Sequence, residues 1–333
     1  MFDVDKPLYD QTTYWGRFMH MYYLCGPGSW NTLLVSNKEL RRCCDLVEQY
    51  RQMPTVQKET VLPEKLLWAK HVKDATCHPD TQMPIPFPFR MSAHVPMNTL
   101  LLLGMLSATT RRQHIIAQTC NQTFNAFQFF FNRNHSNHVS TGTLALATSA
   151  AVLGATGAVV VMDKWVEKLK ARGSGRYAMA QLFLPLVCAA SAKPFQIALM
   201  RSDELVTGVK VYDETQETCF GSSALAGLTA IGLTITTRVT YLVQPMLLPP
   251  LLMRGMQKSR ALRRIPMLLQ AINFSFICAC SAIATPMCIA LFEQRSSLSI
   301  SSLEPELREK ARSHYEERGV SEDQYRVYFN KGL

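Results

Sequence analysis

Residues Thr143 to Val161 read TLALATSAAVLGATGAVVV, a run of 19 residues without a charged side chain. A helix needs about 20 mostly apolar residues to cross the hydrocarbon core, because its backbone amides are then satisfied inside the segment. Four further stretches fit this description, namely 95–110, 178–200, 224–252 and 266–292. The sequence therefore predicts an all-α, polytopic membrane protein with about five transmembrane helices, of which 95–110 is the shortest.

Prolines interrupt the fourth of these stretches. Pro245, Pro249 and Pro250 lie in its second half, and proline removes a backbone donor and clashes with the preceding turn. We expect this helix to kink or to end early.

Charged residues divide the chain into three parts. Asp, Glu, Lys and Arg make up 18% of the sequence, and they concentrate in residues 1–94 and 293–333. We expect a soluble N-terminal region over 1–94 with a surface helix at 37–52, a membrane bundle over 95–292 and a charged tail over 293–333. The formal net charge of +10 is not arranged as a basic face with aromatics, so nucleic-acid binding is not expected.

The loops between the spans predict an orientation. With five spans, loops 162–177 and 254–264 lie on the side of the N-terminal region and carry ten Lys and Arg residues, whereas loops 111–142 and 201–222 carry five. The positive-inside rule places the first pair on the side equivalent to the cytoplasm. For a mitochondrial inner membrane, the N-terminus would face the matrix and the C-terminus the intermembrane space.

The stretch 118–134 reads QTCNQTFNAFQFFFNRN and predicts an amphipathic helix, within a segment 112–134, whose polar face consists of carboxamides. At about 100° per residue, one face collects a set of amides opposite Phe124, Phe127 and Phe131. The candidate substrate contacts here are Asn121, Gln122, Asn125, Gln128 and Asn132, with Gln118 on the same face. Carboxamides both donate and accept hydrogen bonds, which suits the ammonium and carboxylate of a zwitterion. The alternative is that these amides only join helices to one another.

Two cations lie inside apolar stretches. Arg238 is surrounded by threonines in 224–252, and Lys193 precedes Pro194 in 178–200. Charges within a membrane are costly unless they face a cavity or a partner, so Arg238 is a candidate ligand for a substrate carboxylate. A structural pairing or snorkelling to the interface is the alternative.

His78, Pro79, Asp80 and Thr81 form a compact turn sequence, which we interpret as a structural or gating turn. No activated nucleophile accompanies it, so catalysis is not expected and no cofactor is predicted. His135 and His138 have a spacing compatible with metal binding but lack nearby carboxylates or thiols, and the ten cysteines contain no C-x-x-C pair. We therefore predict no metal site.

Together these motifs resemble the sideroflexin family along nearly the whole chain. The resemblance rests on HPDT at 78–81, RMSA at 90–93, VPMN at 95–98, NQTFNA at 121–126, NRN at 132–134, ATP at 284–286 and YFNKGL at 328–333. The NRN ending and parts of the C-terminal region are similar to the sideroflexin-2 type. In three places the sequence departs from the family pattern: CGPG at 25–28, Lys193-Pro194 with Gln196 in place of asparagines, and Gln82 in place of a glycine.

The resemblance implies a multi-pass protein of the mitochondrial inner membrane and amino-acid transport. We expect a transporter of small neutral amino acids, serine first, that feeds one-carbon metabolism. The lipid bilayer is the other expected partner, and no protein partner is predicted. The alternative implied by the same resemblance is a membrane factor that does not transport but supports mitochondrial iron and haem homeostasis.

Overall fold

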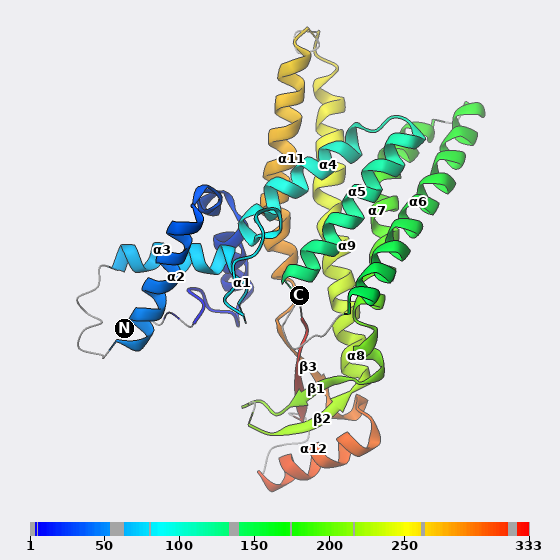
Figure 1. The fold of residues 1–333 in the computed structure, drawn as a ribbon. Helices are drawn as coiled ribbons and strands as arrows, with labels where there is room; N and C mark the ends of the chain where they lie inside the picture. Colours follow the sequence, from blue (N-terminus) through cyan, green and yellow to red (C-terminus); the bar gives the residue numbers. More distant parts are fainter. Residues whose placement is uncertain are drawn as a thin grey trace.

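The computed structural model describes residues 4, 6–53, 63–79, 81–132, 140–173, 175–215, 217–260, 264–318 and 325–332, and shows a helical bundle with a small sheet at one end (Figure 1). Four of its helices are long and apolar enough to cross a membrane: α6 (Thr141–Ala171), α7 (Tyr177–Met200), α9 (Ala224–Met256) and α11 (Pro266–Ile289). Four of the five expected spans are thus present, and the all-α membrane bundle is confirmed.

The remaining stretch, 95–110, lies mostly in the shorter helix α4 (His94–Ser107), which has 14 residues. At 1.5 Å per residue, α4 extends about 21 Å, less than a hydrocarbon core of about 30 Å. It is followed by the predicted amphipathic helix, α5 (Arg111–Asn132). In Figure 1, α4 rises and α5 descends beside α7 and α6.

Helix α9 does not end early. It runs continuously to Met256 with Pro245, Pro249 and Pro250 inside it. Pro245 and Pro249 are buried against the rest of the protein. A buried helix surface compensates for the hydrogen bonds that proline removes, which is why proline is tolerated in membrane helices.

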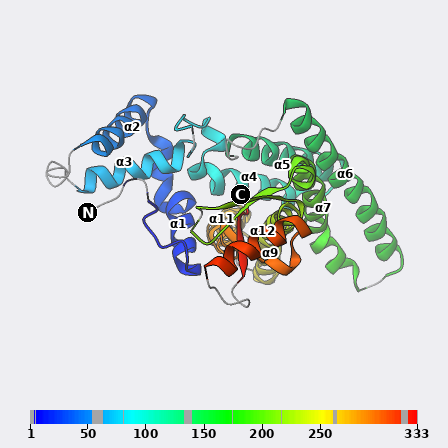
Figure 2. The ribbon, with the colours of Figure 1, turned by 90° about the horizontal axis from the view of Figure 1, so that it is seen from below.

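The N-terminal region is a separate helical layer made of α1 (Tyr14–Cys25), η1 (Pro27–Leu34), α2 (Asn37–Gln52) and α3 (Pro63–Thr76). Helix α2 matches the predicted surface helix and is capped by the hydroxyl of Ser36, which accepts from the Glu39 amide. Its apolar side, with Leu40 and Val47, packs on α3 around Leu66 and Val72. Figure 2 shows α1–α3 and α6 on opposite sides of the molecule, with α9 and α11 between them.

A small antiparallel sheet covers the end of the bundle and was not predicted. Its strands are β1 (Val209–Tyr212), β2 (Cys219–Ser223), β3 (Arg295–Ser299) and β4 (Arg326–Asn330), in the order β2-β1-β4-β3. Helix α12 (Pro305–Glu317) and the turn η5 (Ile300–Ser302) pack on it, and α8 (Ser202–Val206) links α7 to β1. Val211, Phe329 and Leu303 form its core. The 293–333 tail is therefore folded onto the bundle.

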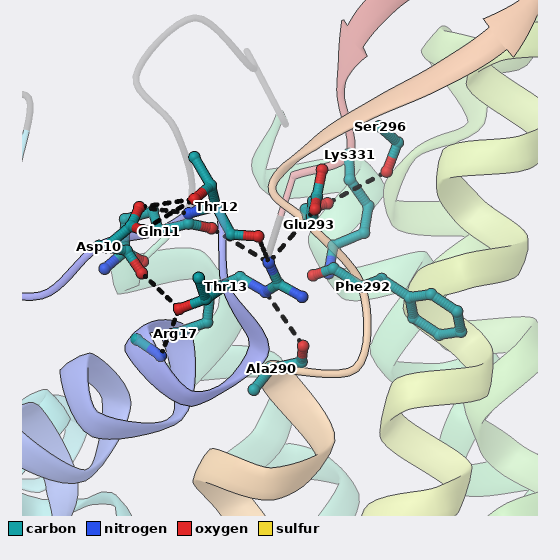
Figure 3. Close-up of polar contacts among 11 residues, drawn as sticks. Asp10, Gln11, Thr12, Thr13, Arg17, Ala290, Phe292, Glu293, Ser296 and Lys331 are labelled. Carbon is teal, nitrogen blue, oxygen red and sulfur yellow. Dashed lines mark hydrogen bonds and ion pairs between the residues drawn. The ribbon is translucent and has the colours of Figure 1, made fainter.

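The N-terminal region is attached to the same end of the bundle as the sheet (Figure 3). The Arg17 Nε–H of α1 donates to the Ala290 carbonyl at the end of α11 over 3.1 Å, and Arg17 Nη1 lies 3.4 Å from Glu293 Oε1. The Tyr14 hydroxyl also donates to the Met287 carbonyl. The N-terminal region and the sheet that contains the C-terminal segment thus lie at one end of the bundle.

Candidate functional site

A cavity of about 870 Å³ lies where α4, α5, α7, α9 and α11 meet strand β4. Its volume is in the range typical of small-molecule sites. The residues that line it and are used below are His94, Asn125, Gln128, Asn132, Lys193, Gln196, Arg201, Asp203, Glu204, Lys210, Arg238, Asn330 and Gly332.

Helix α5 contributes three carboxamides to the cavity wall, and their amino groups are already bound inside the protein. Asn125 Nδ2 donates to the Asn121 carbonyl over 2.7 Å, and Asn132 Nδ2 donates to the carbonyls of Phe89 and Gln128 over 2.8 and 2.9 Å. Backbone carbonyls only accept hydrogen bonds, so these partners fix which end of each asparagine is the NH₂ group.

The carbonyl ends of these carboxamides remain available. Within the described part of the chain, no group donates to the side-chain oxygens of Asn125, Gln128 or Asn132. Each of these residues lines the cavity. One face of α5 thus offers three acceptor oxygens, which is the chemistry that an ammonium group requires.

The rest of the predicted amide face lies outside the cavity wall. Gln118, Asn121 and Gln122 are buried at 2%, 3% and 0% exposure. Gln118 Nε2 donates to the Pro185 carbonyl over 3.3 Å, and the backbone carbonyl of Gln122 accepts from Gln196 Nε2 over 3.4 Å. Among the described residues, no group is hydrogen-bonded to the side chain of Gln122 or to Asn121 Nδ2. The first half of the amide face is thus buried outside the cavity wall, and within it the Gln118 side chain joins α5 to α7.

Both cations predicted from the sequence line the same cavity, from α7 and α9. Lys193 is 5% exposed, and its Nζ lies 3.5 Å from Gln196 Oε1, which is a long contact. Arg238 is partly buried. Among the described residues, no carboxylate forms an ion pair with either cation. The arrangement brings two positive charges to a wall that also carries the three free oxygens of α5.

His94 at the start of α4 was not predicted as a site residue. Gln128 Nε2 lies 2.5 Å from His94 Nδ1, and Asn98 Nδ2 lies 3.4 Å from the same atom and 2.8 Å from the His94 carbonyl. In the neutral tautomer that carries its proton on Nε2, Nδ1 accepts from both amino groups. The sequence signal was the pair His94 and Asn98, which are one helical turn apart.

The ion pair between Arg201 and Glu204, together with the C-terminal strand, forms the mouth of the cavity. Arg201 at the end of α7 donates to Glu204 over 2.9 Å and to the Thr234 hydroxyl over 3.0 Å. Next to this pair lies Gly332, where an added Cβ would be 3.2 Å from the Arg201 guanidinium. The C-terminal segment therefore packs directly against the bundle wall, which sequence analysis missed because a short polar tail carries no pattern for it.

Lys331 in this segment is another buried cation (Figure 3). Its Nζ donates to the Phe292 carbonyl over 3.2 Å and lies 5.8 Å from the centre of the Phe292 ring. Burial, and then the positive charges of Arg238, Arg17 and Arg201, lower the pKa of Lys331 to about 8. The mouth of the cavity is thus in a positive electrostatic field.

The turn that contains His78 and Pro79 lies outside the cavity wall, and Asp80 lies outside the described residues. His78 N donates to the Met83 carbonyl and Gln82 N to the His78 carbonyl, each over 2.9 Å, while the Thr81 amide donates to His78 Nδ1 over 3.3 Å. Gln82 has a φ of +57°, a left-handed conformation that favours glycine. A glycine at this position would adopt the same conformation without the steric cost that glutamine meets.

The segment after this turn contacts α5 on the face opposite the carboxamides. The Phe89 ring, in η3 (Phe87–Phe89), lies 5.5, 5.9 and 4.9 Å from the rings of Phe124, Phe127 and Phe131. Arg90 and η4 (Met91–Ala93) then lead into α4. The chain that follows the turn thus contacts the aromatic face predicted for α5.

His135 and His138 lie outside the described residues. Among the residues that the structure describes, no group of three or more His, Cys, Asp and Glu side chains is placed to hold a metal ion.

Comparison with known proteins gives one family over the whole chain. The model of the sideroflexins matches residues 3–333. Human sideroflexin-1 is 34% identical over 339 residues, covering 99% of this chain and 97% of its own length. Human sideroflexin-3 is 32% identical over 332 residues, covering 99% and 98%, and sheep sideroflexin-1 is 32% identical over 335 residues, covering 99% and 97%. No solved structure matches. With a family model that covers the chain and relatives above 30% identity along its length, this protein belongs to the sideroflexin family.

Proposed function

We propose that this protein carries small neutral amino acids, serine first, across the mitochondrial inner membrane and so supplies one-carbon metabolism. Its family supports carrier activity rather than catalysis. The observation that supports an amino-acid cargo is the distribution of free polar groups in the cavity: acceptor oxygens on α5 and cations on α7 and α9. A zwitterion presents the complementary groups, an ammonium and a carboxylate.

Arg238 is the proposed ligand of the substrate carboxylate. The planar guanidinium donates two parallel hydrogen bonds to a carboxylate, which fixes orientation as well as charge. Asn125, Gln128 and Asn132 are the proposed ligands of the ammonium through their unpaired oxygens. Asn121 and Gln122 do not line the cavity, so they are not among the proposed ligands.

The orientation follows from the charges at the two ends of the bundle. The loops 162–177 and 254–264, with ten Lys and Arg residues, connect α6 to α7 and α9 to α11 at the end remote from the sheet (Figure 1). The positive-inside rule assigns that end to the matrix. We propose that the sheet, the C-terminal segment and the N-terminal region all face the intermembrane space, in place of the matrix location expected for the N-terminus from five spans.

Serine uptake by the purified protein in liposomes tests this function. We expect Asn125→Ala with Asn132→Ala to reduce uptake about tenfold or more, because hydrogen bonds to a charged group contribute about 1.5–3 kcal/mol each. Gln181→Ala is the matched control, since it removes an exposed carboxamide of α7 away from the cavity. Normal uptake by the double variant, with an unchanged elution profile, would contradict the site.

A second measurement separates transport from the alternative role in iron and haem homeostasis. Mitochondria that lack the protein should take up less labelled serine and recover when it is expressed again. Unchanged serine uptake together with a haem or respiratory defect would favour the factor that does not transport.

A further inference from the structure

The interior of the cavity carries more positive charge than a neutral amino acid compensates. Lys193 and Arg238 both line it, and no carboxylate among the described residues pairs with either. The other charged lining residues balance one another: Arg201 pairs with Glu204 over 2.5 Å, and Lys210 and Asp203 are exposed at the rim. Two uncompensated cations therefore remain in the interior.

A neutral amino acid brings one negative charge to these two cations. Its ammonium is directed to the free oxygens of α5, and its single carboxylate neutralises one cation. The other basic group would then either lose its proton or stay unpaired in a region of low dielectric constant, and a second negative charge would stabilise its protonated form. This imbalance cannot be relieved by Gln196, because the contact to Lys193 is 3.5 Å long and involves a neutral amide.

The two cations also differ in the ligand that they suit. The guanidinium of Arg238 matches the fork of a carboxylate, whereas the ammonium of Lys193 is a compact point charge that suits a small anion or one carboxylate oxygen. Lys193 and Gln196 lie one turn apart on α7, so they form one local group on the cavity wall.

We infer that the cavity binds two negative charges at once: the α-carboxylate of the amino acid at Arg238 and a second negative charge at Lys193. This inference rests on the proposed function, since it assigns the first charge to an amino-acid cargo. The second charge has two possible sources, an acidic side chain on the cargo or a separate small anion such as chloride. Both have the same chemistry at Lys193, and the experiment separates them.

Uptake into liposomes is measured for labelled serine, asparagine and aspartate, each in chloride and in gluconate. An acidic side chain as the source predicts that aspartate is taken up about tenfold better than asparagine, its neutral isostere. A separate anion predicts that serine uptake falls about tenfold when gluconate replaces chloride. In either case Lys193→Gln should abolish the dependence, because the partner of the second charge is removed, while Lys164→Gln, an exposed cation of α6, should preserve it.

Other outcomes overturn the inference or the proposed function separately. Serine uptake that is independent of chloride, with no preference for aspartate over asparagine, would refute the second charge and leave serine transport intact. A dependence that persists in Lys193→Gln would refute the assignment to Lys193. If no amino acid is transported, the proposed function fails, and thermal unfolding in detergent then tests the site at Lys193 by itself. Stabilisation by chloride or aspartate that Lys193→Gln loses would keep the second site, and its absence would end the inference.

Discussion

Arg17 should hold the N-terminal region on the bundle, and replacing it with methionine tests this most directly. Arg17→Met keeps an apolar stem of similar length but removes every donor. The guanidinium donates to the carbonyls of Ala290 and Gln11, both over 3.1 Å in partly buried surroundings. These carbonyls would be left unpaired, and the end of α11 would lose the cation that complements its dipole.

The magnitude follows from these bonds. A hydrogen bond from a charged donor contributes about 1.5–3 kcal/mol net, so the loss of two lowers the free energy of unfolding by about 3 kcal/mol after allowing for their partial exposure. Only the bond to Ala290 joins the N-terminal region to the bundle, because Gln11 belongs to the N-terminal region itself. The ion pair with Glu293, whose side chain is 56% exposed, adds only about 0–1 kcal/mol. A loss of about 1.5 kcal/mol across this contact raises the detached fraction of the N-terminal region about tenfold.

Thermal unfolding and limited proteolysis of the protein in detergent measure this effect. We expect Arg17→Met to lower the melting temperature by about 6 °C and to speed cleavage between the N-terminal region and α4. Glu293→Gln is the control for the exposed ion pair and should change both readouts little. Equal effects of the two variants, or no effect of Arg17→Met, would refute the assignment of the attachment to the carbonyl bonds.

Two further predictions concern the turn after α3 and the C-terminal segment. Gln82→Gly should raise the free energy of unfolding by about 1 kcal/mol. Relief of a left-handed non-glycine residue gains about 1–2 kcal/mol, whereas loss of the exposed side-chain bond to the Pro79 carbonyl costs about 0.5 kcal/mol. Gln82→Ala, which keeps the left-handed strain, should instead lower the stability in the same thermal assay. Burial lowers the pKa of Lys331 from 10.5 to about 8, so the unfolded chain binds more protons than the folded chain between pH 8 and pH 10.5. The stability of the wild type should therefore rise over this pH range relative to Lys331→Gln. A constant difference in melting temperature between the two proteins from pH 7 to pH 10 would contradict this prediction.

The spans and the sheltered face of α5 were predictable because each depends on a local pattern. An apolar run of about 20 residues is sufficient to identify α6, α7 and α11. The 100° spacing placed Gln118 and Asn121 on a buried side, and Phe127, which lies nearly opposite, is 44% exposed. The prediction that the helix over 224–252 ends early was wrong, because helix propensity does not include the packing around the prolines of α9.

The sheet could not be predicted because its strands have only four or five residues and its central pair, β1 with β4, joins distant parts of the chain. Val211 of β1 lies opposite Phe329 of β4, and no hairpin signal connects them. The charge imbalance of the cavity could not be predicted for the same reason, because it depends on contacts between distant parts of the chain. Lys193 and Arg238 each stood out as a charge in an apolar run, but only the packing of α7 on α9 brings them to one wall.

The turn that contains His78 and Pro79 is linked to the cavity wall through Phe89 and α5. Phe89, eight residues after Thr81, packs on Phe131 with ring centres 4.9 Å apart, and its carbonyl accepts from Asn132 Nδ2. Together with the bond to the Gln128 carbonyl, this bond orients the Asn132 amide so that its oxygen faces away from both carbonyls. A shift of the turn that moves Phe89 would therefore disturb one of the two bonds that orient Asn132, which is a proposed ligand of the ammonium.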